Sequence, residues 1–208
     1  MVHGYHLILA AYGFWLPNDP RGTWSDFVGK WDLVWFGRTR KSLERRSLAE
    51  LSDQELAERE AARQSLKYPA VQFTGVQALA IAQGFAAASE RSNYTIWGCA
   101  ILPEHTHLVV ARHTYEVEKI ANLLKGAATR ELMNQNLHPL ARFAKPGERP
   151  PRMWSEHEWK VYLDSEESIE NAIQYVAENP IKEDKPAQKW SFVKPFQGLN
   201  RSGWVTYH

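Results

Sequence analysis

Short apolar runs alternate with longer amphipathic stretches along the chain, and the two kinds predict different elements. Runs rich in β-branched and aromatic residues predict buried strands at residues 5–12, 94–102, 105–112 and 159–163. Only Pro103 and Glu104 separate the second run from the third. So short a link predicts that these two strands form an antiparallel hairpin.

Helical spacing of apolar residues predicts two helices in the first half of the chain. Residues 47–66 form a charged, amphipathic stretch, in which Ser52 and Glu55 have the spacing of a capping box. Thr74 can cap a second helix over residues 75–91, which is rich in alanine. Its expected buried positions are Val76, Leu79, Ala80, Ala82 and Phe85.

Two further helices follow in the second half. Residues 117–135 carry apolar residues at helical spacing, and the last helix begins with an acid-rich turn at residues 164–167. Asn179-Pro180 is expected to end that helix, because proline breaks the backbone hydrogen-bond ladder. Between these helices, residues 137–152 hold prolines, a glycine and basic residues, which indicates a loop.

The predicted order is strand, helix, strand, strand, helix, strand, with an extra early helix. This order suits an α+β, ferredoxin-like (RRM-like) fold, whose antiparallel sheet carries helices on one face, followed here by a C-terminal helix with Tyr175. At 208 residues the chain is long enough for one domain with a full core. We therefore expect a single domain over residues 1–208, with an inserted basic and helical segment at about 20–70 and a C-terminal tail at about 183–208.

The charge balance gives no strong sign of a nucleic-acid partner. Lysine and arginine total 25 against 24 acidic residues, so binding to DNA would need locally clustered charge. A single cysteine, Cys99, excludes an internal disulfide and is typical of a reducing compartment. The start of the chain lacks a signal-peptide pattern, and the longest mostly apolar run, residues 7–16, is too short to cross a bilayer. A cytoplasmic protein without a membrane partner is expected.

His105-Thr106-His107 is the sharpest local feature. Residues two apart on a strand point to the same face, so both imidazoles project from one side of the sheet. They are expected on the face left open by the helices at 75–91 and 117–135, close enough to share one divalent cation. Histidine is a common metal ligand, although a His-x-His pattern alone also occurs by chance.

Tyr175 and Asn179 lie one turn apart on the flank of the last helix. The phenol and the amide would stack at the helix edge, where they could face a neighbouring metal. An ordinary half-buried tyrosine is the alternative interpretation. The buried stripe of this helix is expected to be Ile169, Ala172, Ile173 and Val176.

Two basic clusters lie in or beside predicted loops, and the tryptophans Trp35 and Trp154 flank them. Cations neutralise phosphates and aromatic faces stack on unpaired bases, so both clusters are candidates for contacts to nucleic acid. An ordinary solvated surface is the alternative. The candidate residues are Arg38, Arg40, Lys41, Arg45 and Arg46 in the first cluster, and Arg142, Lys145, Arg149 and Arg152 in the second.

Two segments in combination resemble a known family. Residues 101–110, ILPEHTHLVV, resemble the apolar-Pro-acid-His-x-His-apolar signature of the single-tyrosine HUH transposases. Residues 173–181, IQYVAENPI, are similar to the helix that carries the nucleophile of that family, and residues 154–163 to the Trp-containing segment before it. The resemblance is strongest to the REP-associated tyrosine transposases and their insertion-sequence relatives. Thr106 departs from the pattern, which usually has a larger apolar residue between the histidines.

The resemblance implies a metal-dependent endonuclease and strand transferase for single-stranded DNA, which cleaves through a covalent 5′-phosphotyrosine. It assigns nucleophilic attack to Tyr175, and the metal to His105, His107 and Asn179. The family uses Mg²⁺ or Mn²⁺, so one of these is the expected cofactor. Single-stranded or hairpin DNA is the expected partner of a monomer or homodimer, which in a prokaryote would associate with the nucleoid.

Two functions from other classes stay open at this point. A non-catalytic, RRM-like module would bind nucleic acid through strand aromatics and would have no need of Tyr175. A small metal-dependent hydrolase would combine the two histidines with a carboxylate such as Glu104 or Glu178. Neither of these alternatives predicts a covalent adduct with DNA.

Overall fold

The computed structural model describes residues 1–14 and 52–199. Within these residues, four strands form one antiparallel sheet, in the spatial order β2-β3-β1-β4. The inner strands, β1 and β3, are buried along almost their whole length. The strands are β1 (Gly4–Ala10), β2 (Ile96–Ile101), β3 (His105–Ala111) and β4 (Trp159–Leu163).

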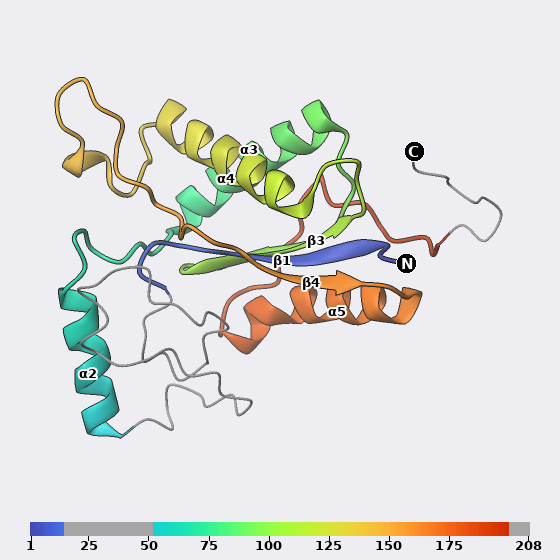
Figure 1. Cartoon of the computed structure of the whole chain (residues 1–208), viewed down its shortest axis with the longest axis horizontal. Coiled ribbons are helices and arrows are strands. Elements are labelled where there is room, and N and C mark those ends of the chain that lie inside the picture. The colour runs from blue at the N-terminus through green and yellow to red at the C-terminus, as the bar shows by residue number, and fades with distance from the viewer. Residues whose placement is uncertain (15–51, 200–208) are drawn as a thin grey trace. The chain divides into compact units, whose positions relative to one another are not determined.

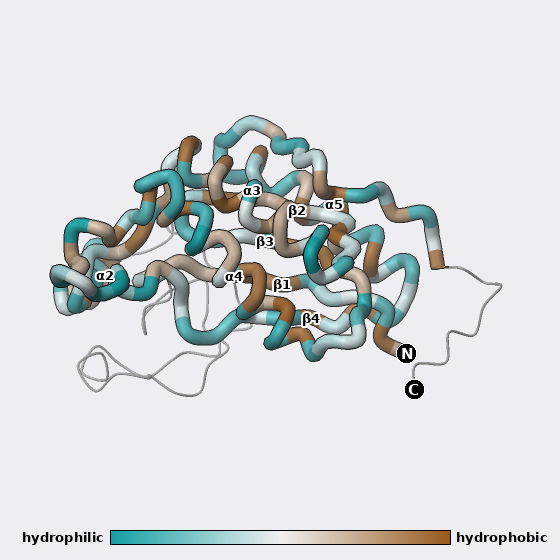
Figure 2. The backbone as a smooth tube through the Cα atoms, turned by 90° about the horizontal axis from the view of Figure 1, so that it is seen from above, coloured by the Kyte–Doolittle hydropathy of each residue, from teal (hydrophilic) through white to brown (hydrophobic). Residues whose placement is uncertain are grey.

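Helices cover both faces of this sheet (Figure 1). α3 (Gly75–Ser92) and α4 (Val117–Asn134) pack side by side on one face, which is seen from above in Figure 2, and α5 (Glu166–Lys182) lies on the other. β1, α3, β2, β3, α4 and β4 follow one another in the order of the ferredoxin-like fold, so the predicted α+β fold class is confirmed. In the described part of the chain, no helix is long and apolar enough to span a membrane.

The chain divides into two compact units. The sheet and the helices α3, α4 and α5 belong to the first unit, which comprises residues 1–10 and 72–208. The second comprises residues 11–71 and contains α2 (Asp53–Gln64), whose N-terminus has the predicted capping box of Ser52 and Glu55. Trp35 and the first basic cluster lie outside the described residues; that cluster comprises Arg38, Arg40, Lys41, Arg45 and Arg46.

Helix α3 begins as predicted, and Ala80, Ala82 and Phe85 are buried as expected. Thr74 caps its N-terminus, and the Gln77 N–H donates to the Thr74 hydroxyl at 3.3 Å. Val76 and Leu79, which were expected in the core, are 62% and 52% exposed. The core side is made mostly of small residues, because α4 packs closely against it. The buried residues are Ala80, Ile81, Ala82, Gly84, Phe85, Ala88 and Ser89.

Helix α5 continues past Asn179-Pro180, where the sequence predicted its end, and finishes at Lys182. Proline has a φ close to the helical value, but it removes the hydrogen bond that its own N–H would donate and its ring crowds the carbonyl one turn earlier. The helix closes one turn later, where the Glu183 N–H donates to the Asn179 carbonyl at 3.2 Å. Because Pro180 lies in the last turn, the break is local and Asn179 keeps its helical position.

A buried ion pair ties α4 to the segment that leads into β4. The Lys125 ammonium donates to Glu158 Oε2 at 3.1 Å and to the Ser155 carbonyl at 3.2 Å. The side chains of Lys125 and Glu158 are only 7% and 9% exposed. A buried charge is costly unless it is paired and hydrogen-bonded, and both conditions hold here. The pair therefore holds the start of β4 against the body of the first unit.

Helices α3 and α4 approach each other closely where Gly84 faces Ala127 and Ala128. A Cβ atom at Gly84 would lie 2.6 Å from the Ala128 Cα and 2.8 Å from the Ala127 carbonyl oxygen. Both are backbone atoms, which cannot move aside as the end of a flexible side chain can. The crossing therefore needs glycine for space, although glycine is an unfavourable residue inside a helix.

Gly84→Ala is expected to destabilise the protein by about 1–3 kcal/mol, because overpacking outweighs the ~1 kcal/mol that alanine gains over glycine in a helix. Gly126→Ala in α4 is the matched control, since its added Cβ would meet only the end of the Arg130 side chain, at 3.6 Å. Urea denaturation should find the control as stable as the wild type or more so. Equal stability of the two variants would contradict the close crossing.

The buried thiol of Cys99 on β2 gives a second prediction. Cys99 lies opposite Leu108 of β3 and is 7% exposed. Burial raises the pKa of the Cys99 thiol and so suppresses the reactive thiolate. The native protein is expected to react with an aromatic disulfide reagent far more slowly than protein unfolded in guanidinium. Rapid labelling of the native protein would show that β2 is not covered as described.

Candidate active site

Alternation along β3 places His105 and His107 on the α5 side of the sheet. Val109, two residues further, packs in an apolar cluster with Ile169 and Val176 of α5. Residues two apart on a strand share a face, so both histidines project toward the same helix. Their ring centroids are 4.8 Å apart. The prediction that they lie side by side, on the face that α3 and α4 do not cover, is confirmed.

This face is not open, however. α5 packs across β2 and β3, and the exposed fractions are only 7% for His105 and 2% for His107. The expectation of an open histidine pair was wrong, because the sequence does not show which face the last helix covers. Buried imidazoles are normally hydrogen-bonded, and β1 and α5 supply such partners to His107.

His6 of β1 is a site residue that the sequence analysis did not select. Its Nε2 lies 3.0 Å from His107 Nδ1, and the side chain is buried. The register pairs Ile8 with His107 and His6 with Val109, so the two histidines are diagonal neighbours on one face. Strand alternation in the sequence puts His6 and Ile8 on one face of β1. Only the register shows which residues of β3 they meet.

Helix α5 presents Tyr175, Asn179 and Glu183 to the histidines at intervals of four residues. The Tyr175 ring centroid is 5.5 Å from that of His107, and the Asn179 amide nitrogen is 3.3 Å from His107 Nε2. Glu183 Oε1 lies 3.8 Å from His105 Nε2. Such spacing stacks side chains along one flank of a helix, as predicted for Tyr175 and Asn179. Glu183 was missed because the predicted helix ended before it.

Tyr175 is half-buried beside the histidines and also lies near a cation. Its ring centroid is 5.7 Å from that of His6 and 5.4 Å from the Lys182 ammonium. Lys182 in turn pairs with Glu178, at 2.9 Å. Hydrogen bonds from Lys182 and Gln174 lower the pKa of the Glu178 carboxyl. Glu178 is thus engaged along the outer surface of α5.

The carboxylates of the hydrolase alternative do not complete a metal site with the histidines. Glu104 accepts a hydrogen bond from Gln72 at 3.0 Å, and Glu178 accepts one from Gln174 at 2.8 Å. Across residues 1–14 and 52–199, no three His, Cys, Asp or Glu side chains come together as a group that could hold a metal ion. Glu183, which the sequence analysis did not name, is instead a carboxylate that lies beside His105, at 3.8 Å.

The side chains that meet beneath α5 are nonetheless of types that bind a divalent cation. His105 and His107 face Glu183 and Asn179 through their Nε2 atoms. Imidazole nitrogens and an amide oxygen are cation ligands, and a set of three leaves positions for water or phosphate oxygens. Imidazole prefers softer metals than Mg²⁺, so these residue types alone do not select the metal.

The second basic cluster lies on the segment between α4 and β4, which contains a short 3-10 helix, Ala141–Phe143. Trp154, expected to flank this cluster and stack on bases, is buried against Phe73 with ring centroids 5.0 Å apart. That expectation was wrong, because the indole packs into the core. The basic residues themselves are all exposed: Arg142, Lys145, Arg149 and Arg152.

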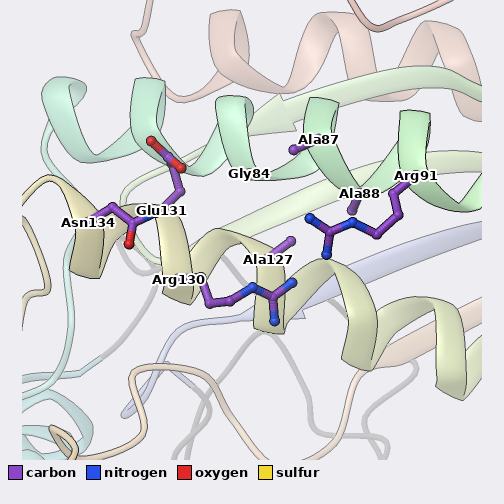
Figure 3. A pocket seen from close by; sticks show the side chains of 8 residues that line it. All are labelled: Gly84, Ala87, Ala88, Arg91, Ala127, Arg130, Glu131 and Asn134. Carbon is purple, nitrogen blue, oxygen red and sulfur yellow. The ribbon is translucent and has the colours of Figure 1, made fainter.

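A groove of about 230 Å³ lies between α3 and α4 (Figure 3). Small residues at the helix crossing leave this space, and Arg91 and Arg130 line it. It lies on the other face of the sheet from the histidines and contains none of the predicted site residues. The candidate chemistry is therefore separate from this concavity.

No protein-family model and no curated protein matches the sequence. Among solved structures, the chain is similar to a REP-associated tyrosine transposase bound to a REP hairpin, with a TM-score of 0.45 and 12% identity, over 97% of this chain and 93% of that one. It is also similar to a protein of Deinococcus radiodurans provisionally described as a transposase, with a TM-score of 0.39 and 13% identity, over 90% of this chain and 94% of that one. The first of these has the family name that the two sequence motifs suggested. The function proposed for this chain therefore rests on its site residues and not on these likenesses.

Proposed function

We propose that the chain is a metal-dependent endonuclease and strand transferase for single-stranded DNA, with Tyr175 as its nucleophile. The observation that carries this proposal is the meeting of Tyr175 and Asn179, one turn apart on α5, with His107 of β3. The Tyr175 ring packs against the apolar cluster of α5 and the sheet, and it also borders two imidazoles and an ammonium.

In the proposed reaction, the Tyr175 hydroxyl oxygen attacks a phosphorus atom of the DNA backbone. A bond forms between that oxygen and the 5′-phosphate, and the bond from phosphorus to the 3′ oxygen breaks. The phenolic proton passes to solvent, and the departing 3′ oxygen takes a proton to become a hydroxyl. The phosphotyrosine conserves the energy of the phosphodiester, so a second 3′-hydroxyl can attack it and join two strands without ATP.

The residues around Tyr175 would divide the remaining work. His105, His107 and Asn179 would hold Mg²⁺ or Mn²⁺, which when bound polarises the phosphate and neutralises its charge. The Lys182 side chain, 58% exposed and 5.4 Å from the Tyr175 ring, adds a positive charge that a phosphate can reach. Tyr175, Asn179 and Lys182 all belong to α5, and a helix holds such groups in a fixed relation to one another.

Single-stranded or hairpin DNA is the proposed substrate. The scissile phosphate must reach histidines that are buried beneath α5, and a flexible single strand can do this more readily than stiff duplex DNA. With a net charge of only +1, the chain needs local cations to bind phosphates. The described residues that would supply them by counterion release are Arg142, Lys145, Arg149 and Arg152.

Tyr175→Phe is expected to abolish a covalent protein–DNA adduct while leaving the fold intact, because it removes only a hydroxyl from a half-buried ring. The assay incubates the protein with labelled hairpin oligonucleotides and Mn²⁺ or Mg²⁺, then resolves the products on a denaturing gel. Tyr162→Phe is the matched control, since Tyr162 is 54% exposed on β4. Its neighbour Leu163 packs toward α5, so Tyr162 points to the other face.

The position of the label tests the polarity of cleavage. A 5′-phosphotyrosine carries a 3′-end label onto the protein and releases a 5′-labelled fragment that ends in a hydroxyl. A Tyr175→Phe protein that still forms the adduct would move the chemistry to Tyr162 or to Tyr115, which lies between β3 and α4. A wild-type protein that binds the hairpins but never forms the adduct, with either metal, would favour the non-catalytic RRM-like module.

Binding is expected to weaken as salt rises and to favour hairpins over plain duplex. Arg142→Gln with Arg149→Gln should lower the slope of log affinity against log salt by roughly 1.4, because each phosphate of a single strand that an arginine neutralises accounts for ~0.7. Arg91→Gln with Arg130→Gln is the matched control, because it removes the same charge from α3 and α4. Fluorescence anisotropy over a range of salt concentrations measures both pairs. An equal decrease in the two pairs would contradict a localised binding surface.

A further inference from the structure

We infer that His6 is a positioning residue, which holds His107 in the tautomer whose Nε2 lone pair faces α5. The inference rests on the proposed function and adds to it a residue that acts through His107. His6 Nε2 and His107 Nδ1 lie 3.0 Å apart, and the two side chains are 8% and 2% exposed. At that burial, a hydrogen bond between imidazoles has little competition from water.

The two nitrogens of His107 are both occupied, which restricts where its proton can lie. Nδ1 faces His6, and Nε2 faces the Asn179 amide at 3.3 Å. A neutral imidazole donates through one nitrogen and accepts through the other. If Asn179 donates to Nε2, His107 must donate from Nδ1 and His6 must accept through Nε2. The opposite order would place the proton of His107 on Nε2, facing α5.

Only the arrangement in which His107 donates from Nδ1 to His6 leaves Nε2 of His107 as an electron-pair donor toward α5. Such a lone pair can bind a cation or accept a proton, whereas an Nε2–H can do neither. Histidines that bind metals commonly donate their other N–H to a fixed acceptor, which selects the tautomer and aims the ring. His6 is in the right place to be that acceptor. Its own remaining proton then lies on Nδ1.

The surroundings of His6 fix its ring for this task. It is held on β1, an inner strand that pairs with β3 on one side and β4 on the other. The rings of Trp159 and Tyr175 lie on its flanks, with centroids 6.4 and 5.7 Å away. The His6 and His107 rings are inclined by 34°, with centroids 5.2 Å apart. The packed His6 ring cannot move with the His107 ring. Rotation of His107 would therefore break the hydrogen bond between them, so His6 holds His107 in place.

Metal-free protein provides the first test, which requires neither DNA nor activity. Long-range ¹⁵N–¹H correlation spectra distinguish the Nδ1–H tautomer of histidine from the Nε2–H tautomer. His107 is expected in the Nδ1–H form in the wild type and in His6→Gln, whose amide oxygen can replace the imidazole acceptor. His6→Leu removes the acceptor and should shift His107 toward the Nε2–H form. A wild-type His107 protonated at Nε2 would overturn the inference, even if His6→Leu fails to fold.

The second test measures the affinity for Mn²⁺ by calorimetry on the full chain. His6→Leu should weaken binding by about 10- to 100-fold, the usual effect of losing such a supporting partner. His6→Gln should restore most of the affinity, which a role in packing alone would not predict. His138→Leu is the matched control: His138 is also buried, but its Nδ1 accepts from the Leu140 N–H in the segment after α4. This control should bind Mn²⁺ as the wild type does.

These results separate the inference from the function on which it rests. Loss of the tautomer and of Mn²⁺ affinity in His6→Leu supports the positioning role, even if no hairpin tested forms an adduct. Equal Mn²⁺ affinity and an unchanged His107 tautomer in His6→Leu would refute it, even if the wild type forms the adduct through Tyr175. A loss that His6→Gln fails to restore would also refute it, because the role requires only an acceptor at that point.

Discussion

The antiparallel pairing of β1 with β3 is the constraint on which the candidate site depends. Each residue of β1 pairs with a residue of β3, and the pairs run from Gly4–Ala111 to Ala10–His105. A shift of one residue would turn His6 to the opposite face of the sheet and remove it from His107. Because both faces are covered, such a shift would also exchange the residues that pack toward α5 with those that pack toward α3 and α4. The packing of the core therefore fixes the hydrogen bond between the two histidines.

Helix α5 adds the second half of the site through the same kind of coupling. Its apolar residues Ile169, Ala172 and Val176 pack with Val109 on the sheet, and this burial sets the rotation of the helix about its own axis. Once that rotation is set, the neighbouring flank with Tyr175 and Asn179 faces the histidines. The hydrophobic packing of α5 thus positions the polar groups of Tyr175 and Asn179.

The sequence predicted the elements and the pairing of motifs, but not the contacts that depend on tertiary structure. Alternation on β3 and helical spacing on α5 are local rules, so the common face of His105 and His107 and the shared flank of Tyr175 and Asn179 could be predicted. His6 depends on strand register, and the burial of the histidines depends on which face α5 covers; neither leaves a local pattern. The prediction that Val76 is buried was wrong for a related reason. The close helix crossing at Gly84 selects small residues for the buried side of α3.

The two faces of the sheet bury different kinds of side chain, which explains why the candidate site lies on only one of them. Between the sheet and α3 and α4, the helices bury mainly apolar side chains such as Phe85 and Leu124, and Cys99 on β2 is buried with a raised pKa. Beneath α5, burial of polar imidazoles costs stability unless each hydrogen-bonding group finds a partner. His6 and Asn179 supply such partners to His107. The contacts that make this burial tolerable are therefore the ones that orient the imidazole toward Tyr175, so in this site stability and alignment have a common physical origin.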